Sequence, residues 1–391
     1  MDQGRRVGIV GAGQLARMMA QAAIPLEIDL VLLAASANDG AAKVVPQVIV
    51  GAPDDPDRMR DLAERVDVLT FDHELVDHAH LAALEADGFT VWPSAATMAL
   101  AQNKRRQRAE LGAAGFPVPA FTDVETFADL VAFGKAHGWP VVVKASRGGY
   151  DGRGVWIASS EDEARTIVDE AQAHGTVLLA EQFLALDREL AVLVARRPSG
   201  EVAVYPAVET VQRNGVCNEL RVPLAAAGDH AREAEAMARR IAEETQAVGI
   251  MAVEFFVAND TLYVNELAPR PHNSGHWTIE GAQTSQFEQH LRAVLDLPLG
   301  ATGLTGAAVA TVNVLGPADG SDPADRLPEA LAMPGVHVHL YGKAARPGRK
   351  LGHVTVVGAD ADEVFARATR AAAVLDGTMN AVDGEQDRID G

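Results

Sequence analysis

The sequence predicts a protein of mixed α/β and α+β class, and three observations support this prediction. Short apolar runs alternate with helical stretches over residues 1–98, as expected for parallel β-α-β units. Longer strands, hairpins and amphipathic helices follow in two lobes, at about 99–179 and 180–298. Residues 299–391 are rich in predicted strands and end in one helix and an acidic tail. A chain of 391 residues is long enough for several buried cores.

Composition excludes several classes of protein. A formal net charge of -20 argues against a nucleic-acid surface, which would need clustered Lys and Arg. No apolar run approaches the roughly 18 residues of a membrane span, and the start lacks the apolar core of a signal peptide. The single cysteine, Cys217, excludes an internal disulfide and suits a reducing compartment. We therefore expect a cytoplasmic protein that binds neither nucleic acid nor membranes.

The first predicted strand runs into a glycine-containing turn. In GIVGAGQLARMM, Gly11, Gly13 and Ala16 have the spacing of the G-x-G-x-x-G/A fingerprint of Rossmann-like, dinucleotide-binding domains. Such a site also needs an acidic residue at the end of the second strand, but this strand ends in LVLLAAS. A turn that serves packing or another ligand is therefore favoured over NAD binding. The elements expected here are strands at 7–10, 29–33, 47–50, 66–71 and 90–92, helices at 14–23, 57–65 and 78–87, and one further helix at about 95–112.

The segment VVVKASRGGYDGRGV has the composition of an anion-binding turn. Lys144 ends an apolar strand, and four glycines follow it within ten residues. Such glycine density lets backbone N–H groups surround a phosphate. Lys144 and Arg153 add positive charge suited to a phosphoryl group in transfer. The alternative is a flexible hairpin tip.

Two glutamates on a predicted hairpin indicate a divalent cation. In VEFFVANDTLYVNE, an odd number of loop residues would place Glu254 directly opposite Glu266. Like charges at such a position are unfavourable unless a cation lies between them. Carboxylates together with nucleotide phosphates are ligands that Mg²⁺ prefers. An even loop would place the glutamates on opposite faces, but we favour the metal, because both apolar strands carry an acid there.

Other polar residues extend a candidate nucleotide site. In LLAEQFLALDRE, the stretch Glu181 to Leu184 could pair its backbone with an adenine edge, and Glu189 could accept hydrogen bonds from ribose hydroxyls. Lys104 could reach a phosphate from the other side. Each acid taken alone would be interpreted as a surface charge.

Histidines and basic residues mark two further segments. In APRPHNSGHWT, His272 and His276 have the spacing of a helical zinc pair, but two prolines argue against a helix, so we expect a polar substrate loop with Arg270 as an anion ligand. His337 and His339 alternate on a predicted strand, where an exposed face is favoured over a zinc pair.

In YGKAARPGRKLGH, four cations lie within eight residues around a Pro-Gly turn. Such crowding is unfavourable unless an anion is bound, and a solvated basic turn is the alternative.

These segments resemble the ATP-grasp superfamily and, within it, the 5-(carboxyamino)imidazole ribonucleotide synthase family. The resemblance covers nearly the whole chain, in the order GAGQLARMM, VLTFDHELVD, SRGGYDGRGVW, NELAPRPHNSGHWT and YGKAARPGRKLGH. GGYDGRG combined with APRPHNSGHWT is specific to this family. The resemblance implies a Rossmann-like domain (1–98), a two-lobed ATP-grasp domain (99–298) and a small β-rich C-terminal domain (299–391), typically in a homodimer.

The resemblance also implies an activity and its residues. The family's members are ligases of purine biosynthesis that couple ATP cleavage to the carboxylation of 5-aminoimidazole ribonucleotide by bicarbonate, with Mg²⁺. Mg²⁺ would be bound by Glu254 and Glu266. Bicarbonate and carboxyphosphate would meet Tyr150, Asp151, Arg153 and Lys144. ATP would be held by Lys104, Lys144, Gly149, Tyr150, Asp151, Gly152, Arg153, Gly154, Val155, Glu181, Gln182, Phe183, Leu184, Glu189, Gln212, Asn265 and Glu266. The ribotide would be bound by Gln14, Leu15, Glu74, Arg270, His272, Lys343, Arg349 and Lys350.

Four positions depart from the patterns of the family or of the wider superfamily, and Ala12 and Ala16 are two of them, at positions where glycines are common. Gln212 stands where a histidine is common at the ATP site, and Ala268 where many ATP-grasp enzymes have an asparagine. Four other interpretations remain open. Two lie within the superfamily, a formate-using ribotide transformylase and a carboxylase acting on biotin. The others are an NAD oxidoreductase and a nucleotide-binding regulatory module without turnover.

Overall fold

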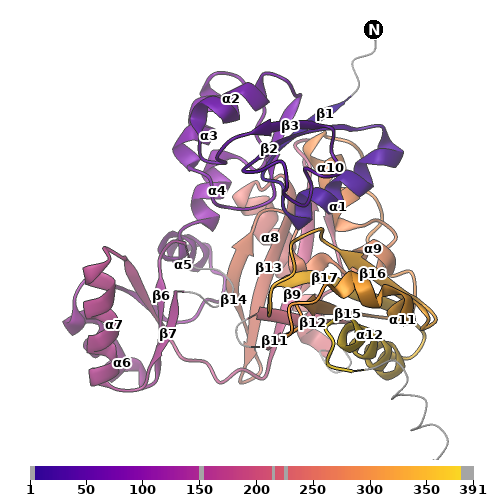
Figure 1. The fold of residues 1–391 in the computed structure, drawn as a ribbon. Coiled ribbons are helices and arrows are strands. Elements are labelled where there is room, and N and C mark those ends of the chain that lie inside the picture. Colours follow the sequence, from indigo (N-terminus) through magenta and orange to yellow (C-terminus); the bar gives the residue numbers. More distant parts are fainter. Residues whose placement is uncertain (1–4, 149–153, 214–215, 224–227, 380–391) are drawn as a thin grey trace, which may run out of the picture.

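Three β-sheets organise the chain (Figure 1). The computed structural model describes residues 5–148, 154–213, 216–223 and 228–379. The N-terminal part lies at the top of Figure 1, a small magenta lobe lies below it to the left, and the longest strands fill the centre and right. The mixed α/β and α+β class expected from the sequence is confirmed.

The N-terminal sheet is parallel throughout. Its strand order is β3-β2-β1-β4. Val91 makes only an isolated bridge with Leu69, so the strand expected at 90–92 is reduced to one residue pair. The elements are β1 (Arg6–Val10), α1 (Gln14–Ala23), η1 (Ile24–Leu26), β2 (Asp29–Ala34), β3 (Gln47–Val50), α2 (Pro56–Ala63), β4 (Val68–Phe71) and α3 (His78–Ala86).

The single helix expected at about 95–112 is two helices, α4 (Ala95–Ala101) and α5 (Lys104–Ala113). The break occurs because the Asn103 side chain accepts a hydrogen bond from the backbone N–H of Arg106 at 3.2 Å and so caps a new helix. The backbone N–H of Lys104 donates to the carbonyl of Ser146 at 2.9 Å. The break therefore places Lys104 beside the end of the strand that carries Lys144.

The small lobe is an antiparallel sheet with two helices on one face. Side chains of both helices share one core with alternate strand residues, among them Val143 and Ala180. Because successive strand residues face opposite sides, Lys144 and Glu181 project from the other face. The strand order is β5-β8-β6-β7. The elements are β5 (Phe121–Val124), α6 (Phe127–His137), β6 (Val141–Ala145), β7 (Val155–Ala158), α7 (Glu161–Ala173) and β8 (Leu178–Gln182).

The largest sheet has nine strands and continues into the C-terminal part. Its order is β14-β13-β9-β11-β12-β15-β17-β16, with β10 paired to β9. Because β15 pairs with β12, the boundary expected between 298 and 299 runs through one continuous sheet. The division into three domains stays a prediction. The strands are β9 (Arg188–Arg196), β10 (Val202–Val204), β11 (Val208–Arg213), β12 (Val216–Val222), β13 (Gly249–Ala258), β14 (Thr261–Ala268), β15 (Ala308–Leu315), β16 (Val336–Leu340) and β17 (Lys350–Gly358).

Helix α10 connects this sheet to the N-terminal part. Its residues Phe287, Leu291 and Val294 share a buried core with Met19 of α1 and with Tyr341. The N-terminal sheet and the loop after β16 are therefore held against the same helix. The remaining helices are α8 (Gly228–Thr245), η2 (Asn273–Gly275), α9 (Thr278–Gly281), α10 (Gln286–Val294), η3 (Pro323–Arg326), α11 (Leu327–Leu331) and α12 (Ala361–Leu375).

Candidate functional site

Three charged side chains form a buried cluster on the open face of the small lobe. Lys144 Nζ lies 2.7 Å from Glu181 Oε2, and Arg108 Nε lies 2.7 Å from Glu181 Oε1. Burial acts to raise the pKa of Glu181, but the charges of Lys144 and Arg108 outweigh it and lower this pKa to about 2. The Glu181 carboxylate is thus committed to the two cations, and the Glu181 backbone lies within the sheet between β5 and β6. Arg108 was missed from the sequence, since nothing distinguishes it from the other arginines of its helix.

Glu254 and Glu266 lie opposite each other, as expected, but by a different route. The hairpin loop has two residues, Asn259–Asp260, both at positive φ, so the odd loop expected from the sequence is wrong. A β-bulge restores the facing pair, because Asn265 is an extra residue on β14. Bulges re-aim side chains. Here Asn265 donates from Nδ2 to Glu254 Oε2 at 3.4 Å and accepts at Oδ1 from Lys144 Nζ at 3.4 Å.

The two facing glutamates are not equally compensated. Burial, followed by the charges of Glu266 and Glu189, raises the pKa of Glu254 to about 7. Burial also acts on Glu266, but the ammonium of Lys104, 2.6 Å from Oε1, outweighs it and holds the pKa of Glu266 below its usual value. Surplus negative charge on paired oxygen ligands fits a hard divalent cation. These carboxylates therefore suit Mg²⁺.

The connection between the two lobes borders this pair. Residues 183–187 link β8 to β9 without helix or strand, and Phe183 is 40% exposed. Glu189 lies on β9, where burial raises its pKa and the Gln212 side chain hydrogen-bonds to it. Gln212, which stands where the family commonly has a histidine, thus contacts Glu189, the acid predicted to bind the ribose.

The glycine-rich segment is described only at its end. Gly154 accepts a hydrogen bond at its carbonyl from the backbone N–H of Ala145 at 2.8 Å, and Val155 opens β7. Five predicted site residues, Gly149, Tyr150, Asp151, Gly152 and Arg153, lie outside the described residues.

The loop after β14 links the glutamate pair to the N-terminal part. Arg270 Nε forms an ion pair with Glu74 Oε2 at 2.8 Å, and His272 Nε2 lies 3.6 Å from Glu254 Oε1. The backbone N–H of Ser274 donates to His272 Nδ1 at 3.3 Å, which places the proton of the neutral imidazole on Nε2. Three predicted site residues, Glu74, Arg270 and His272, therefore meet beside the predicted metal site.

The glycine turn of the N-terminal sheet holds an anion supplied by the chain itself. The backbone N–H of Gly13 donates to Asp72 Oδ2 at 2.5 Å, at the start of α1. A Cβ at Gly11, which has a φ of +108°, would lie 1.7 Å from Asp72 Oδ1. A dinucleotide would place its pyrophosphate at this helix terminus. The Asp72 carboxylate thus occupies the start of α1, where the pyrophosphate of NAD would have to bind.

The same turn is tied to the basic loop between β16 and β17. The backbone N–H of Ala41 donates to the carbonyl of Ala12 at 2.9 Å, and Lys43 Nζ donates to the carbonyl of Gly342 at 2.7 Å. A Cβ at Gly40 would lie 2.4 Å from the carbonyl of Tyr341. These contacts bring the start of α1, with Gln14 and Leu15, into one region with the 341–349 loop.

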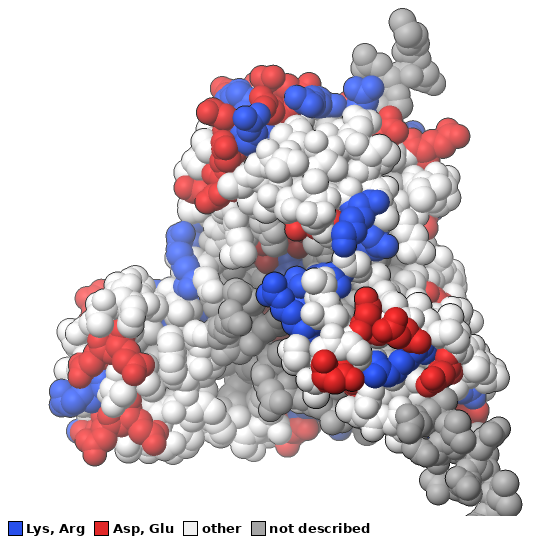
Figure 2. Space-filling view, viewed as in Figure 1, with Lys and Arg blue, Asp and Glu red and all other residues white. Residues whose placement is uncertain are grey.

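Basic side chains gather on this loop. Figure 2 shows Lys and Arg at the centre of the face, beside a hollow, where Figure 1 has the connection between β16 and β17. Lys343 Nζ lies 5.5 Å from the Tyr341 ring centroid, and Arg349 Nη1 donates to the carbonyl of Ala344 at 3.0 Å. Lys350 is close enough to contribute, after burial and Arg270, to lowering the pKa of His272.

The histidine expectations need correction. His276 is fully buried rather than part of a polar loop, because Phe287 of α10, Tyr341 and His353 pack around its ring. His337 is exposed, as expected, but His339 is half-buried, and its Nε2 is 2.7 Å from Glu280 Oε1. Within the described residues, no group of three or more His, Cys, Asp or Glu could hold a metal ion by itself. Zinc is not supported at either pair.

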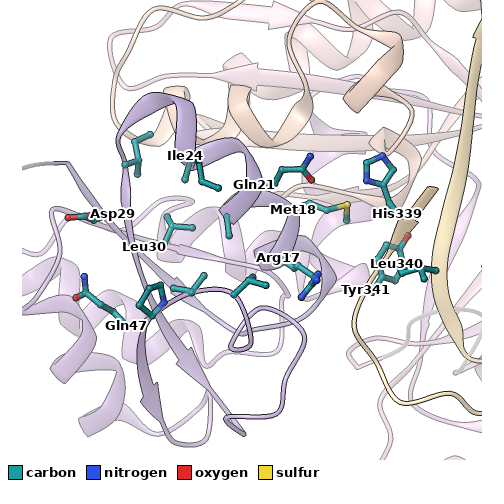
Figure 3. A pocket seen from close by; sticks show the side chains of 16 residues that line it. Arg17, Met18, Gln21, Ile24, Asp29, Leu30, Gln47, His339, Leu340 and Tyr341 are labelled. Atoms are coloured by element: carbon teal, nitrogen blue, oxygen red, sulfur yellow. The ribbon is translucent and has the colours of Figure 1, made fainter. Parts of the chain in front are cut away.

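A cavity of about 400 Å³ lies between α1, β2 and the end of β16, next to the start of the basic loop (Figure 3). Met18, Ile24 and Leu30 give it an apolar wall, and His339 and Tyr341 border it on the β16 side.

Of the helices that the structure describes, none has both the length and the apolarity to cross a membrane.

Three family models match consecutive parts of the chain. They are the ribonucleotide synthetase preATP-grasp domain at 4–102, the ATP-grasp domain at 109–287 and the phosphoribosylaminoimidazole carboxylase C-terminal domain at 309–367. Proteins named N5-carboxyaminoimidazole ribonucleotide synthase from Mycobacterium tuberculosis and Corynebacterium ammoniagenes are 48% and 42% identical. Each alignment covers 94% of this chain, and 86% and 91% of the respective relatives.

Solved structures agree with these matches. An N5-carboxyaminoimidazole ribonucleotide synthetase from Thermus thermophilus is 38% identical with a TM-score of 0.84, over 93% of this chain and 98% of that one. An N5-carboxyaminoimidazole synthase from Aspergillus clavatus, in complex with ADP and 5-aminoimidazole ribonucleotide, is 32% identical with a TM-score of 0.87. That match covers 96% of this chain and all (100%) of the other.

Proposed function

The chain belongs to the N5-carboxyaminoimidazole ribonucleotide synthase family, and we propose that it carries out that family's reaction. It would carboxylate 5-aminoimidazole ribonucleotide with bicarbonate and ATP, in de novo purine biosynthesis. One observation carries the proposal: a continuous line of polar contacts runs from Lys144 through Asn265 and Glu254 to His272. It joins the nucleotide region to the ribotide region.

The reaction divides into two steps. An oxygen of bicarbonate attacks the γ-phosphate of ATP in line, which forms carboxyphosphate and releases ADP. The exocyclic amine of the ribotide then attacks the carboxyl carbon of carboxyphosphate, or CO₂ released from it. The C–O bond to phosphate breaks, phosphate leaves and the amine loses a proton.

The nucleotide residues act mainly through charge. Lys144, fixed by Glu181, would contact the phosphates, and Lys104 would reach them from α5. Glu254 and Glu266 would hold Mg²⁺, which supplies charge neutralisation at the transferring phosphoryl group when bound. Tyr150, Asp151 and Arg153 would face bicarbonate and carboxyphosphate. Since carboxyphosphate hydrolyses readily, the site has to exclude water while this intermediate exists.

The ribotide would lie between the N-terminal turn and the basic loop. Lys343, Arg349 and Lys350 would bind its phosphate, and Gln14 and Leu15 would border it. Glu74, fixed by Arg270, would face the amine.

We further propose a homodimer in the cytoplasm. Ile24 and Val44, 77% and 48% exposed, both line the apolar cavity beside α1, and this contiguous apolar surface supports contact with a second copy of the chain. Light scattering would measure the mass.

The test is ADP production by the purified protein with each amine and carbon source in turn. We expect turnover only when ATP, bicarbonate and 5-aminoimidazole ribonucleotide are all present. Equal turnover with formate and glycinamide ribotide, or with biotin, would reject the substrate assignment. Binding of ATP without any ADP production would favour a regulatory module, and nicotinamide fluorescence on mixing with NADH would favour an oxidoreductase.

A further inference from the structure

A column of three stacked histidine rings connects the two loops assigned to the ribotide. The His339 and His353 ring centroids lie 4.6 Å apart with the planes 19° from parallel. The His353 and His276 centroids lie 4.8 Å apart at 25°. His353 lies three residues after Lys350, and His276 lies four residues after His272. The column thus spans from the base of the basic loop to the loop after β14.

Each ring is fixed by a side chain from a different element. Glu280 Oε1 lies 2.7 Å from His339 Nε2, and the Tyr341 hydroxyl lies 2.8 Å from His353 Nδ1. Gln286 Nε2 donates to His276 Nδ1 at 3.2 Å. These three contacts hold the orientation of the whole column.

Gln286 also fixes the backbone of a ribotide residue. Its Nε2 donates to the carbonyl of His272 at 2.8 Å, and its Oε1 accepts from the backbone N–H of His272 at 2.8 Å. One buried amide therefore holds both His272 and the His276 ring. A displacement of the column would reach His272 through this amide.

Burial keeps two rings of the column, those of His276 and His353, neutral. It lowers the pKa of His276 and of His353 well below the usual histidine value, and the charge of Lys350 adds to this effect at His276. Neutral rings can stack at these distances without the repulsion of two imidazolium ions.

The column is not the most stable filling for this space. In the described part of the chain, His276 Nε2 and His353 Nε2 are buried without a hydrogen-bond partner. Unsatisfied buried polar atoms cost stability that an apolar core would not. Buried rings with unsatisfied hydrogen-bonding atoms are expected where a functional site, rather than stability, requires a defined geometry.

We propose that the His339–His353–His276 column, with Tyr341, is a positioning device that sets the separation between the basic loop and the loop after β14. This inference rests on the proposed function. His276, His353 and Tyr341 are at most 1% exposed, so they act through Lys343, Lys350 and His272 rather than by touching the ribotide. Tyr341 is the link to Lys343, because it begins the basic loop and its ring faces the Lys343 ammonium.

The test compares two variants that each lose one buried side-chain hydroxyl. Tyr341→Phe removes the hydroxyl bonded to His353. Thr355→Val, the matched control, removes the buried hydroxyl that lies 2.8 Å from Thr311 Oγ1 on the same strand as His353. We expect Tyr341→Phe to raise KM for the ribotide about three- to tenfold, the range of one lost hydrogen bond, with KM for ATP unchanged. Thr355→Val should lower thermal stability and leave both KM values unchanged.

A second pair of variants separates positioning from stability. His353→Leu removes the ring nitrogen that is bonded to the Tyr341 hydroxyl, whereas His353→Asn retains a polar atom near the Nδ1 position. We expect ribotide KM to rise in His353→Leu and to be largely restored in His353→Asn.

An unchanged ribotide KM in Tyr341→Phe and His353→Leu would overturn the column's role, as would an equal rise in KM for ATP. Wild-type ADP formation is measured in the same assay. Its independence of the ribotide would reject the proposed function itself, and the column's role with it.

Discussion

Two carboxylates, the buried Glu181 and the half-buried Glu254, meet opposite surroundings within one site. Glu181 lies between Lys144 and Arg108, and its pKa falls to about 2. Glu254 faces Glu266 across the β13–β14 hairpin, and its pKa rises to about 7. Glu181 has its cations built into the fold, whereas Glu254 has no Lys or Arg ion-pair partner among the residues that the structure describes.

This difference separates a structural role from a binding role. A carboxylate that is neutralised in the free protein can fix Lys144, but it has little charge left for a ligand. A carboxylate left uncompensated destabilises the free protein and gains most when a cation arrives. The small lobe thus provides a fixed cation, and the hairpin holds the pair of carboxylates proposed for Mg²⁺.

The largest expected effect is the loss of the compensated cluster. Glu181→Gln leaves Lys144 and Arg108 buried without their anion, which should lower the free energy of unfolding by about 3–5 kcal/mol. Chemical denaturation would measure it. Glu161→Gln is the control, because it removes an exposed ion pair of the same lobe, with Lys135 at 3.1 Å, and should cost less than about 1 kcal/mol. Similar losses in both variants would contradict the assignment of Glu181.

The stabilisation that Glu181 provides should depend on pH. Because the folded pKa of Glu181 is depressed from 4.5 to about 2, its stabilisation is complete above about pH 4.5 and is lost as the pH falls towards about 2. The stability difference between wild type and Glu181→Gln should therefore shrink over that interval. A difference that stays constant down to pH 2 would show that the charge of Glu181 is not its source.

The uncompensated pair should matter for turnover rather than for folding. Glu254→Gln and Glu266→Gln each remove half of the predicted Mg²⁺ clamp, and we expect kcat to fall by about 10²- to 10³-fold, the usual cost of one lost electrostatic contact to the transition state. Asp260→Asn, at the exposed tip of the same hairpin, should keep full activity. Wild-type kcat at limiting Mg²⁺ in either glutamine variant would exclude the metal role.

The basic loop should show a smaller, substrate-specific effect. Lys343→Ala or Arg349→Ala should raise KM for the ribotide by about ten- to a hundredfold, since a charge-assisted contact contributes about 1.5–3 kcal/mol. KM for ATP should change little, because the proposed ATP site lies between the lobes, away from this loop. Arg367→Ala, a cation on α12 bonded to the carbonyl of Pro334, is the control and should leave both values unchanged. Unchanged ribotide KM in both loop variants would make the loop a solvated surface.

The sequence predicted the residues of the hairpin better than its geometry. The facing of Glu254 and Glu266 is confirmed, but the parity of the loop is wrong, because a bulge at Asn265 changes the register. No local pattern marks a bulge at an asparagine within a regular strand. Helix α1 was easier, since its apolar spacing and the preceding glycine turn fix both ends.

Partners from distant segments could not be predicted. Arg108 pairs with Glu181 across 73 residues, and Asp72 reaches the α1 terminus across 59 residues. The histidine column brings His276 and His353 together, although the two residues lie in distant segments and belong to no shared sequence motif. Such contacts depend on which faces the sheets present to one another, and a single sequence gives no measure of that.

The most direct test of the comparison is the stability of Glu254→Gln with and without Mg²⁺ and ADP. Without ligands, removing one of two facing carboxylates should raise the unfolding free energy by about 0.2–1 kcal/mol. At ligand concentrations about 100 times Kd, wild type should gain about 2.7 kcal/mol, and the variant should lose most of the part that depends on Mg²⁺. A variant that is less stable without ligands and keeps the full Mg²⁺-dependent gain would contradict the account.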